Sequence, residues 1–184
     1  MNNYSLILKK DPAARNDPMN ILYGYTSFYS VLFYRISNWI ILQELNKGNR
    51  LDCSNKLYKY ALFLSKRGKE LSNAEINSFA KIGNRFVLDH GIGTVIGETS
   101  VIGNDCYMLG GVILGAKAIS NNPNGNRHPK IGNNVQIGSF SRILGNVNIG
   151  NNVVIGSNCL ILEDIPDNHI VTLKTENYIV KELK

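Results

Sequence analysis

Two of the three histidines in this chain of 184 residues lie where a regular repeat of the sequence is interrupted. His90 lies at a shift in the register of the repeat, and His128 lies at the end of a stretch in which the repeat is absent. An imidazole titrates near neutral pH, so it can act as a general base that takes a proton from a hydroxyl group. We therefore predict that neighbouring turns of the fold or neighbouring subunits bring the two histidines together over a cleft, one as the base and one as a substrate contact. His169 lies beyond the repeat and is expected to be structural.

A general base must be held in one orientation, and three acidic residues around His90 are candidates for this role. They are Glu75, Asp89 and Glu98. A carboxylate bound to the far ring nitrogen fixes the tautomer and stabilises the imidazolium that forms when the base takes a proton. Spacing alone does not decide among the three carboxylates. For Glu98, the alternative is a solvent-exposed corner or a structural ion pair.

The elements that position these side chains follow from a period of six residues. Between residues 131 and 162, isoleucine recurs at every sixth position, and the positions four residues further on are small or β-branched. The two series are Ile131, Ile137, Ile143, Ile149, Ile155 and Ile161, and Val135, Ser141, Val147, Val153 and Cys159. This period fits neither an amphipathic helix nor an alternating strand, but it is typical of a parallel β-helix. Each hexapeptide would supply a short strand and a corner, and three of them would close one triangular coil.

Asparagine and glycine crowd the expected corners, in Gly132–Asn134 and Gly150–Asn152, where positive φ angles are predicted. The repeat begins near Ile76, continues to Leu88, shifts by two residues and resumes at Ile96. A shift at this point predicts a bulge that re-aims a side chain. Between residues 116 and 129 the period disappears, so this stretch must leave the wall of the prism as a loop. Long loops on rigid scaffolds commonly carry function.

Residues 1–70 are rich in Leu, Tyr, Phe and Lys and poor in Gly, which predicts an N-terminal helical domain. One helix should carry an apolar face, formed by Leu32, Phe33, Ile36, Trp39 and Ile40. Gly48 should cap its C-terminal end, and a second helix should stop at Gly68. We expect the apolar faces to pack against the β-helix and neighbouring subunits. Residues 71–165 would then form the β-helix, with the loop at 116–129, and residues 166–184 a polar C-terminal tail.

Composition narrows the class of protein. Lys and Arg number 20 against 14 Asp and Glu, and this net charge of +6 suits a polyanionic ligand but is too diffuse for nucleic-acid binding. The longest uncharged runs, residues 143–162 and 18–34, contain too many polar residues for a membrane span. No secretion signal is evident at the start of the chain. Cys53, Cys106 and Cys159 are widely spaced, which favours reduced thiols in the cytoplasm and gives no reason to expect a metal.

Five stretches of the chain resemble the serine O-acetyltransferases, which are left-handed parallel β-helix, hexapeptide-repeat acyltransferases with an N-terminal α-helical domain. The stretches are Lys9–Arg15, Phe33–Trp39, Leu88–Thr99, Arg127–Gly132 and Ile143–Asn146. They match in order from about residue 7 to residue 165. The combination of Asp-Pro-Ala, Asp-His-Gly with Gly-Glu-Thr, and Arg-His-Pro is specific. The hexapeptide alone is not, because it also occurs in acyltransferases for sugars, lipids and antibiotics.

The resemblance implies the transfer of acetyl from acetyl-CoA to the hydroxyl of L-serine, giving O-acetylserine for cysteine biosynthesis. By this analogy, His90 takes the hydroxyl proton and Glu75 orients His90. The positions that match the family's serine-binding residues are Asp11, Asp89, Arg127 and His128. The resemblance further implies a homotrimer with CoA in a groove between adjacent subunits. There CoA would touch Ala116, Ser139 and Ser157.

The chain also departs from the family pattern. Leu114–Ala118 stands where the family usually has Leu-Gly-Gly-Thr-Gly, the following loop is longer, and Asn77-Ser78 replaces His-Pro. The tail at residues 172–177 differs from the usual Gly-Val-Pro-Ala type. The chain ends in Lys184, whereas members that dock with the cysteine-forming partner enzyme usually end in Ile, which argues against this docking. The short N-terminal part favours a trimer over a hexamer.

Two other functions stay open at this point. An O-acetyltransferase for a sugar or a surface polysaccharide would share the β-helix and the histidine, and the altered loop at residues 115–126 could serve a larger acceptor. A non-catalytic trimeric scaffold would have no need of the shift at His90 or of Glu75. Asp11 and the Arg127–His128 pair favour the amino acid acceptor, because a sugar needs no partners for an ammonium and a carboxylate.

Overall fold

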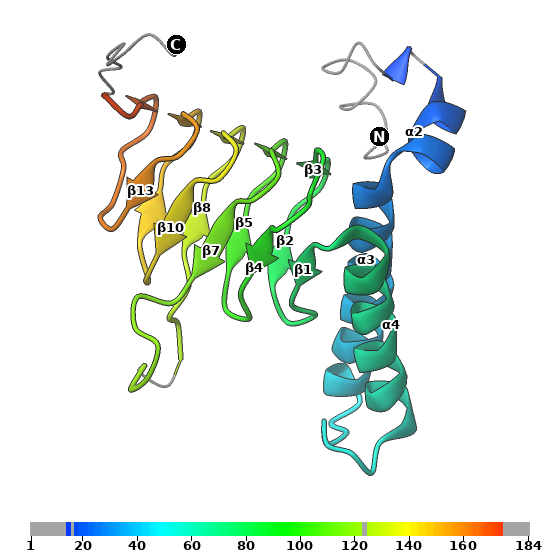
Figure 1. Ribbon diagram of the computed structural model, residues 1–184. Helices are drawn as coiled ribbons and strands as arrows, with labels where there is room; N and C mark the ends of the chain where they lie inside the picture. The colour runs from blue at the N-terminus through cyan, green and yellow to red at the C-terminus, as the bar shows by residue number, and fades with distance from the viewer. Residues whose placement is uncertain (1–13, 16, 123–124, 175–184) are drawn as a thin grey trace, which may run out of the picture.

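The computed structural model describes residues 14–15, 17–122 and 125–174, in which helices stand beside one end of a prism of short strands (Figure 1). The helices are α2 (Pro18–Gly24), α3 (Thr26–Asn46) and α4 (Lys56–Ser72). The strands are β1 (Glu75–Ile76), β2 (Lys81–Ile82), β3 (Val87–Leu88), β4 (Val95–Ile96), β5 (Val101–Ile102), β6 (Tyr107–Met108), β7 (Ile113–Gly115), β8 (Lys130–Ile131), β9 (Gln136–Ile137), β10 (Arg142–Leu144), β11 (Asn148–Ile149), β12 (Val154–Ile155), β13 (Leu160–Ile161) and β14 (Ile170–Val171).

Consecutive strands belong to three different sheets, so each coil of the chain crosses every wall of the prism once. Sheet A contains β1, β4, β7, β10 and β13, sheet B contains β2, β5, β8 and β11, and sheet C contains β3, β6, β9, β12 and β14. The paired strands are parallel. The prediction of a left-handed parallel β-helix with an N-terminal helical domain is therefore confirmed.

Two rows of corners carry most of the candidate site residues of the prism. The A–B edge consists of the corners that lead from sheet A to sheet B, at residues 77–80, 97–100, 116–129 and 145–147. The C–A edge consists of the corners that lead from sheet C to sheet A, at residues 89–94, 109–112, 138–141 and 156–159. The predicted loop at residues 116–129 thus replaces one corner of the A–B edge.

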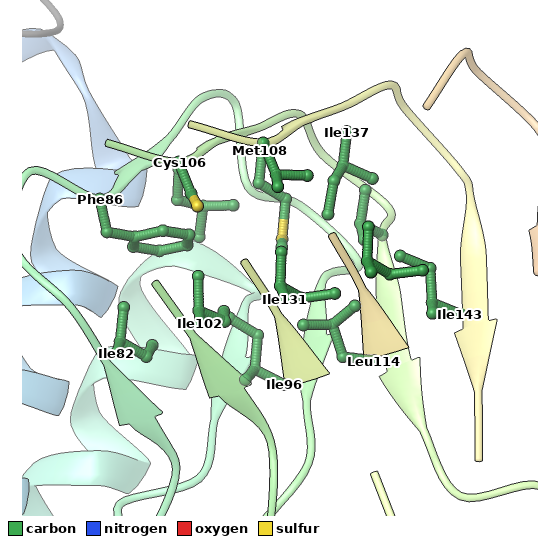
Figure 2. Packing of buried hydrophobic residues seen from close by; sticks show 14 of the residues in the cluster. Ile82, Phe86, Ile96, Ile102, Cys106, Met108, Leu114, Ile131, Ile137 and Ile143 are labelled. Carbon is green, nitrogen blue, oxygen red and sulfur yellow. The ribbon is translucent and has the colours of Figure 1, made fainter. Parts of the chain in front are cut away.

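The six-residue period places one apolar side chain of each coil wall in the interior (Figure 2). The register pairs Ile76 with Ile96, Ile96 with Leu114, and Leu114 with Ile143. These four side chains are at most 4% exposed and form one stacked column. Burying an aliphatic side chain of this size contributes roughly 1.5–3 kcal/mol to stability. The second series of small residues, at 135, 141, 147, 153 and 159, is buried at the corners.

At the corners of residues 132–134 and 150–152, asparagine and glycine have separate tasks. The positive φ falls on Asn134 and Asn152, at +54° and +57°. Gly132 is needed for another reason, because a Cβ there would lie 2.7 Å from the carbonyl of Gly150 in the next coil. Glycine therefore permits close stacking of coils, while asparagine tolerates the left-handed conformation.

Backbone hydrogen bonds join neighbouring coils in both directions. The Glu75 N–H donates to the Thr94 carbonyl toward the next coil at 2.8 Å, whereas the Asp105 N–H donates back to the Asn84 carbonyl of the first coil at 3.0 Å. The first and the last coil each have one side with no further coil, so some of their backbone groups need other partners. Buried backbone groups without partners are costly, so both ends of the prism need caps.

Donors on α3 cap the carbonyls at the N-terminal end. The Tyr34 hydroxyl donates to the Ala80 carbonyl at 2.6 Å, and the Asn38 amide donates to the Ser78 carbonyl at 2.8 Å. The Arg35 guanidinium donates to two further carbonyls of the same coil, at residues 82 and 83. The stretch Phe33–Trp39 is therefore a cap for the prism.

The face of α3 that packs on the prism differs from the predicted apolar face. Of the predicted apolar face, Ile40 is buried and Phe33 packs in the cluster between α3 and α4. Leu32, Ile36 and Trp39 are exposed in the single chain, Trp39 at 61%, and their packing on neighbouring subunits stays a prediction. The two faces differ because the first coil presents carbonyl groups, which need donors and not hydrocarbon. The end of α3 is as predicted, since the Gly48 N–H donates to the Leu45 carbonyl at 2.9 Å and Gly48 has a φ of +72°.

The prediction that the second helix stops at Gly68 is wrong. α4 continues to Ser72, and the residue after it, Asn73, caps the helix in a left-handed conformation. Gly68 lies where α4 packs on α3, and a Cβ there would lie 3.0 Å from the Phe33 Cβ. The glycine therefore allows the two helices to approach closely, and it does not end the helix.

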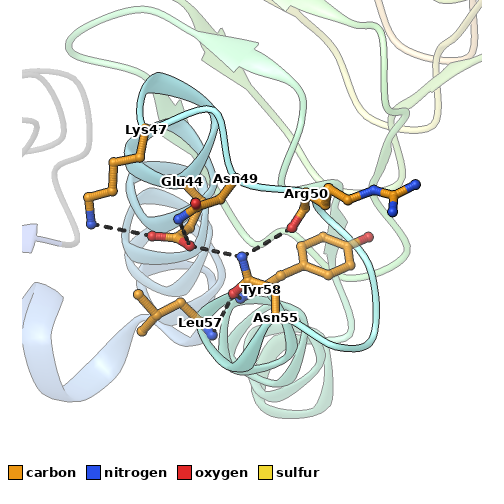
Figure 3. A network of polar contacts seen from close by, with 7 residues as sticks. All are labelled: Glu44, Lys47, Asn49, Arg50, Asn55, Leu57 and Tyr58. Carbon is orange, nitrogen blue, oxygen red and sulfur yellow. Dashed lines mark hydrogen bonds and ion pairs between the residues drawn. The ribbon is translucent and has the colours of Figure 1, made fainter.

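A buried carboxylate joins the end of α3 to the start of α4 (Figure 3). Glu44 accepts hydrogen bonds from the side-chain amides of Asn55 at 2.8 Å and Asn49 at 2.9 Å. Asn55 also caps α4 by accepting a hydrogen bond from the Leu57 N–H. The two amides lower the pKa of Glu44, which keeps it ionised between the helices.

Asp164 and Asp167 accept the N–H groups at the other end of the prism. They bind the backbone N–H groups of Asn148 and Asn151, each at 2.7 Å. Hydrogen bonds from the side chain and backbone of Asn148 lower the pKa of Asp164. Those from the backbone and side chain of Asn151 lower the pKa of Asp167.

The prism extends beyond the expected boundary at residue 165. Ile165 bridges to Ile149 in sheet B, and β14 pairs with β12 in sheet C. The coil therefore continues to Val171. Residues 175–184 of the expected tail lie outside the described residues.

If α3 caps the prism through its donors, Tyr34→Phe should destabilise the protein. The change leaves the buried Ala80 carbonyl without the hydroxyl and should lower the free energy of unfolding by about 1–3 kcal/mol. Denaturant unfolding at a fixed protein concentration measures this, with Tyr23→Phe as a control because Tyr23 is 81% exposed. Equal stability of the two variants would show that the cap does not depend on this hydrogen bond.

Candidate active site

The shift in register at His90 is a widened corner of the C–A edge. Six residues, 89–94, join β3 to β4, whereas four residues, 109–112, join β6 to β7 one coil later. His90, Gly91 and Gly93 all have positive φ, at +60°, +67° and +75°. The His90 side chain projects outward and is 82% exposed. The predicted shift of two residues is therefore confirmed as a corner that is two residues longer, and the bulge that re-aims a side chain stays a prediction.

The start of α3 supports the widened corner. A Cβ added to Gly91 would lie 2.9 Å from the Ser27 Cβ, and Ser27 is buried. A hollow opens between the helices and the corner, lined by Gly24, Tyr25, Thr26, Ser27, Asp89, His90 and Ile92. The helical domain therefore both caps the prism and forms one side of the surface that His90 faces.

Asp89 is the acidic side chain paired with His90. Its Oδ1 lies 3.8 Å from His90 Nε2, and its Oδ2 accepts a hydrogen bond from the Tyr107 hydroxyl at 2.7 Å. Only 13% of the Asp89 side chain is exposed, so Tyr107 holds a largely buried carboxylate in place. Sequence reasoning missed Tyr107. Aligning consecutive coils of the repeat would have placed Tyr107 near Asp89, because β6 pairs with β3 and Tyr107 lies beside Val87.

Glu75 lies at the start of β1 on sheet A. It forms an ion pair with Lys69 of α4 and lines a second hollow, together with Phe79 and Glu98. The described contacts of Glu75 do not include His90. Its role in orienting His90 therefore stays a prediction.

Arg127 and His128 lie on the A–B edge at the end of the long loop. Arg127 forms an ion pair with Glu98, which is the structural ion pair considered for Glu98 from the sequence. The Thr99 hydroxyl accepts hydrogen bonds from the backbone N–H groups of Arg127 at 3.0 Å and His128 at 3.1 Å. Thr99, which sequence reasoning quoted only as part of a motif, therefore fixes the return of the loop to the prism.

His128 is held in one tautomer by the same threonine. Its Nδ1 accepts the Thr99 N–H at 3.1 Å and contacts the Thr99 hydroxyl at 2.8 Å, so the proton of the neutral ring lies on Nε2. Burial lowers the pKa of His128, as does the charge of Arg127, while Glu98 opposes them. The ring lies against Gly97, where a Cβ would be 2.2 Å from Nε2. His128 is thus a buried neutral donor, unlike the exposed His90.

Within one chain the two histidines lie on different edges of the prism, with sheet A between them. No described contact joins them. Of the two routes considered from the sequence, neighbouring coils do not bring them together. Neighbouring subunits are the remaining route.

The three candidate CoA contacts are divided between the same two edges. Ser139 and Ser157 lie on the C–A edge, in the row of corners that includes His90, and the Asn158 N–H donates to the Ser139 carbonyl at 2.9 Å. Ala116 lies at the start of the loop on the A–B edge. A ligand that touches all three would have to span two edges of one prism or lie between two prisms.

Asp11 lies outside the described residues. In the part of the chain that the structure describes, no three His, Cys, Asp or Glu residues are grouped so as to hold a metal ion. None of the helices described is long and apolar enough to span a membrane.

The fold and the repeat define the class of protein. Residues 128–163 match the family described as bacterial transferase hexapeptide (six repeats). A serine acetyltransferase from Helicobacter pylori is 37% identical over 166 residues, which cover 89% of this chain and 88% of that protein. The chain belongs to the serine acetyltransferase family.

Solved structures of the family agree with this assignment. A serine acetyltransferase from Brucella abortus in complex with coenzyme A has a TM-score of 0.79, with 28% identity over 94% of this chain. One from Neisseria gonorrhoeae in complex with serine has a TM-score of 0.77, with 33% identity over 91% of this chain. The chain covers 63% and 62% of those two chains, and 62% of a serine acetyltransferase from Synechococcus elongatus.

The lowered pKa of His128 predicts a pH dependence of stability. Because the folded state favours the neutral ring, stability is fully present above the unfolded pKa of about 6.5 and is lost as the pH falls from there through the lower folded pKa. His128→Asn keeps an acceptor for Thr99 but cannot titrate, so its free energy of unfolding should fall less steeply between pH 7 and 5. Denaturant unfolding at several pH values measures the slope, with His169→Asn as control. A slope identical to that of the unaltered protein would contradict the assignment of a neutral His128.

Proposed function

We propose that the chain is a serine O-acetyltransferase, which transfers the acetyl group of acetyl-CoA to the hydroxyl of L-serine. The observation that carries this proposal is the exposed His90 on a widened corner, where the register of a hexapeptide-repeat transferase is broken. Family membership supports it, and two solved relatives are complexes with coenzyme A and with serine. The product would be O-acetylserine, the precursor of cysteine implied by the resemblance.

His90 is the proposed general base. The serine hydroxyl gives its proton to the imidazole, and its oxygen attacks the carbonyl carbon of the thioester. The tetrahedral intermediate then collapses with cleavage of the carbon–sulfur bond. The CoA thiolate leaves and takes the proton from the imidazolium, so that the base is regenerated.

Charged residues on both edges suit an amino acid acceptor. Asp89 is a largely buried carboxylate beside His90 and would bind the serine ammonium. Arg127, held by Glu98, would bind the serine carboxylate, and the Nε2–H of His128 would donate a hydrogen bond. Asp11 is proposed as a second partner for the ammonium on the basis of the sequence alone.

The carboxylate that orients His90 is proposed to be Glu75. Because Glu75 also forms an ion pair with Lys69, its carboxylate would have to be shared between the lysine and the imidazole. Asp89 is the competing candidate, because one of its oxygens already lies 3.8 Å from His90.

A homotrimer would complete the site. His90 and Arg127 lie on different edges of one prism, and threefold association can set the C–A edge of one subunit against the A–B edge of the next. Acetyl-CoA would then lie in the groove between them, with Ser139 and Ser157 on one wall and Ala116 on the other. Cys53, Cys106 and Cys159 form no disulfide bonds with one another, in keeping with the proposed cytoplasmic location.

Removing the base should abolish most of the activity. His90→Ala should lower turnover by about 10²–10⁴-fold, the usual contribution of a general base, while leaving the melting temperature unchanged because the side chain is exposed. Thiol release from acetyl-CoA with L-serine measures the rate, with His169→Ala as the control. Undiminished turnover would remove His90 from the mechanism. Release with sugars and not with serine would favour a sugar O-acetyltransferase, and release with neither would favour a scaffold.

Mixed trimers test whether the site is shared between subunits. His90→Ala and Arg127→Ala chains should each be nearly inactive alone. After denaturation together and refolding in equal amounts, about a quarter of the interfaces should pair an intact His90 with an intact Arg127, and activity should return in that proportion. If each subunit contains a whole site, mixing will restore nothing.

A further inference from the structure

Tyr107 lies on sheet C, one coil after the site residue Asp89. It occupies the first position of β6, and the register sets it beside Val87 of the coil before and Gln136 of the coil after. Its ring packs against an apolar cluster that contains Ala14, Ile21 and Val87, together with Tyr25 and Phe28. This packing between the helical domain and the prism accounts for the ring, and the hydroxyl group has a separate partner.

The Tyr107 hydroxyl fixes the direction of the Asp89 carboxylate. It donates to Asp89 Oδ2 at 2.7 Å, and a hydrogen bond from a hydroxyl to a carboxylate is among the stronger kinds. The coil fixes the backbone of Asp89 independently, since the Asp89 N–H donates to the Met108 carbonyl at 2.8 Å. With Oδ2 occupied, Oδ1 is the oxygen left on the side of His90, whose Nε2 lies 3.8 Å away.

The charge of Asp89 is not balanced by a basic residue. Glu44, another largely buried carboxylate, has a side chain that is 4% exposed and a counter-ion in Lys47 at 3.4 Å. The Asp89 side chain is 13% exposed, and no Lys or Arg in the part of the chain that the structure describes forms an ion pair with it. Tyr107 supplies a hydrogen bond without a charge, and His90 must be neutral to act as a base. A buried carboxylate is costly without a cation, so Asp89 is suited to take one from a ligand.

We propose that Tyr107 is a positioning residue for the acceptor, because its hydroxyl holds Asp89 so that Oδ1 and the uncompensated charge are available to the serine ammonium. Asp89 lines the hollow between the start of α3 and the widened corner, whereas Tyr107 is not among the residues that line it. Tyr107 therefore acts through Asp89 and not on the substrate itself. The inference rests on the proposed function, in which Asp89 binds the ammonium.

Steady-state kinetics of thiol release test this role with Tyr107→Phe, which keeps the ring in its apolar cluster. Losing a hydrogen bond to a charged group should raise the KM for L-serine about tenfold or more. Because the chemical step and CoA binding do not involve Tyr107, kcat and the KM for acetyl-CoA should change by less than about twofold. Tyr29→Phe is the matched control and should leave all three constants unchanged, since the Tyr29 hydroxyl donates to a backbone carbonyl, that of Leu22, at 3.0 Å.

A double-mutant cycle with Asp89→Asn separates positioning from a general structural effect. Asp89→Asn alone should raise the KM for serine, and adding Tyr107→Phe should raise it no further, because no charge is left to position. An equal further rise in the double variant would overturn the inference. An unchanged KM for serine in Tyr107→Phe, or a loss confined to kcat, would also overturn it, while turnover by the unaltered protein would leave the proposed function intact. If the unaltered protein released no thiol with serine, both would fail.

Discussion

The need for partners for the backbone groups at the two ends of the prism is the constraint on which the rest of the structure depends. Neighbouring coils pair with each other, so the first and the last coil each have one side with no further coil. Hydroxyl, amide and guanidinium donors on α3 bind carbonyls of the first coil, and the carboxylates of Asp164 and Asp167 bind backbone N–H groups near the other end. Both caps are needed, because the free-energy cost of several unpaired backbone groups at a buried end is large compared with the net stability of a folded domain.

The same constraint positions the candidate site. Tyr34 and Asn38 fix α3 on the first coil, and the start of that helix then packs on Gly91. The widened corner that presents His90 is thereby supported by an element whose primary role is to cap the prism. On the other edge, Thr99 ties the long loop back to the coil and sets Arg127 and His128. Rigid coils thus hold side chains that come from irregular segments.

The features that were predicted correctly from the sequence are those that depend on its six-residue period. The column of isoleucines, the short parallel strands, the loop at residues 116–129 and the longer corner at His90 all follow from where the period of six holds and where it fails. It did not predict that α3 would bind the first coil through polar side chains, because apolar spacing carries no information about a neighbour that presents carbonyl groups. Gly68 was misread for a similar reason, since a glycine needed for helix packing looks the same in sequence as one that ends a helix. Tyr107 became visible only once the strands were paired, and the partner of Glu75 depended on how α4 lies against β1.

The central claim is that a base on one edge of the prism meets substrate groups held by the neighbouring subunit. The most direct measurement is an experimental structure of the protein with CoA and L-serine bound. The account predicts a serine hydroxyl oxygen within about 2.6–3.2 Å of a His90 ring nitrogen, with the serine carboxylate on Arg127 of a neighbouring chain. Serine bound away from His90, or held by His90 and Arg127 of the same chain, would contradict it.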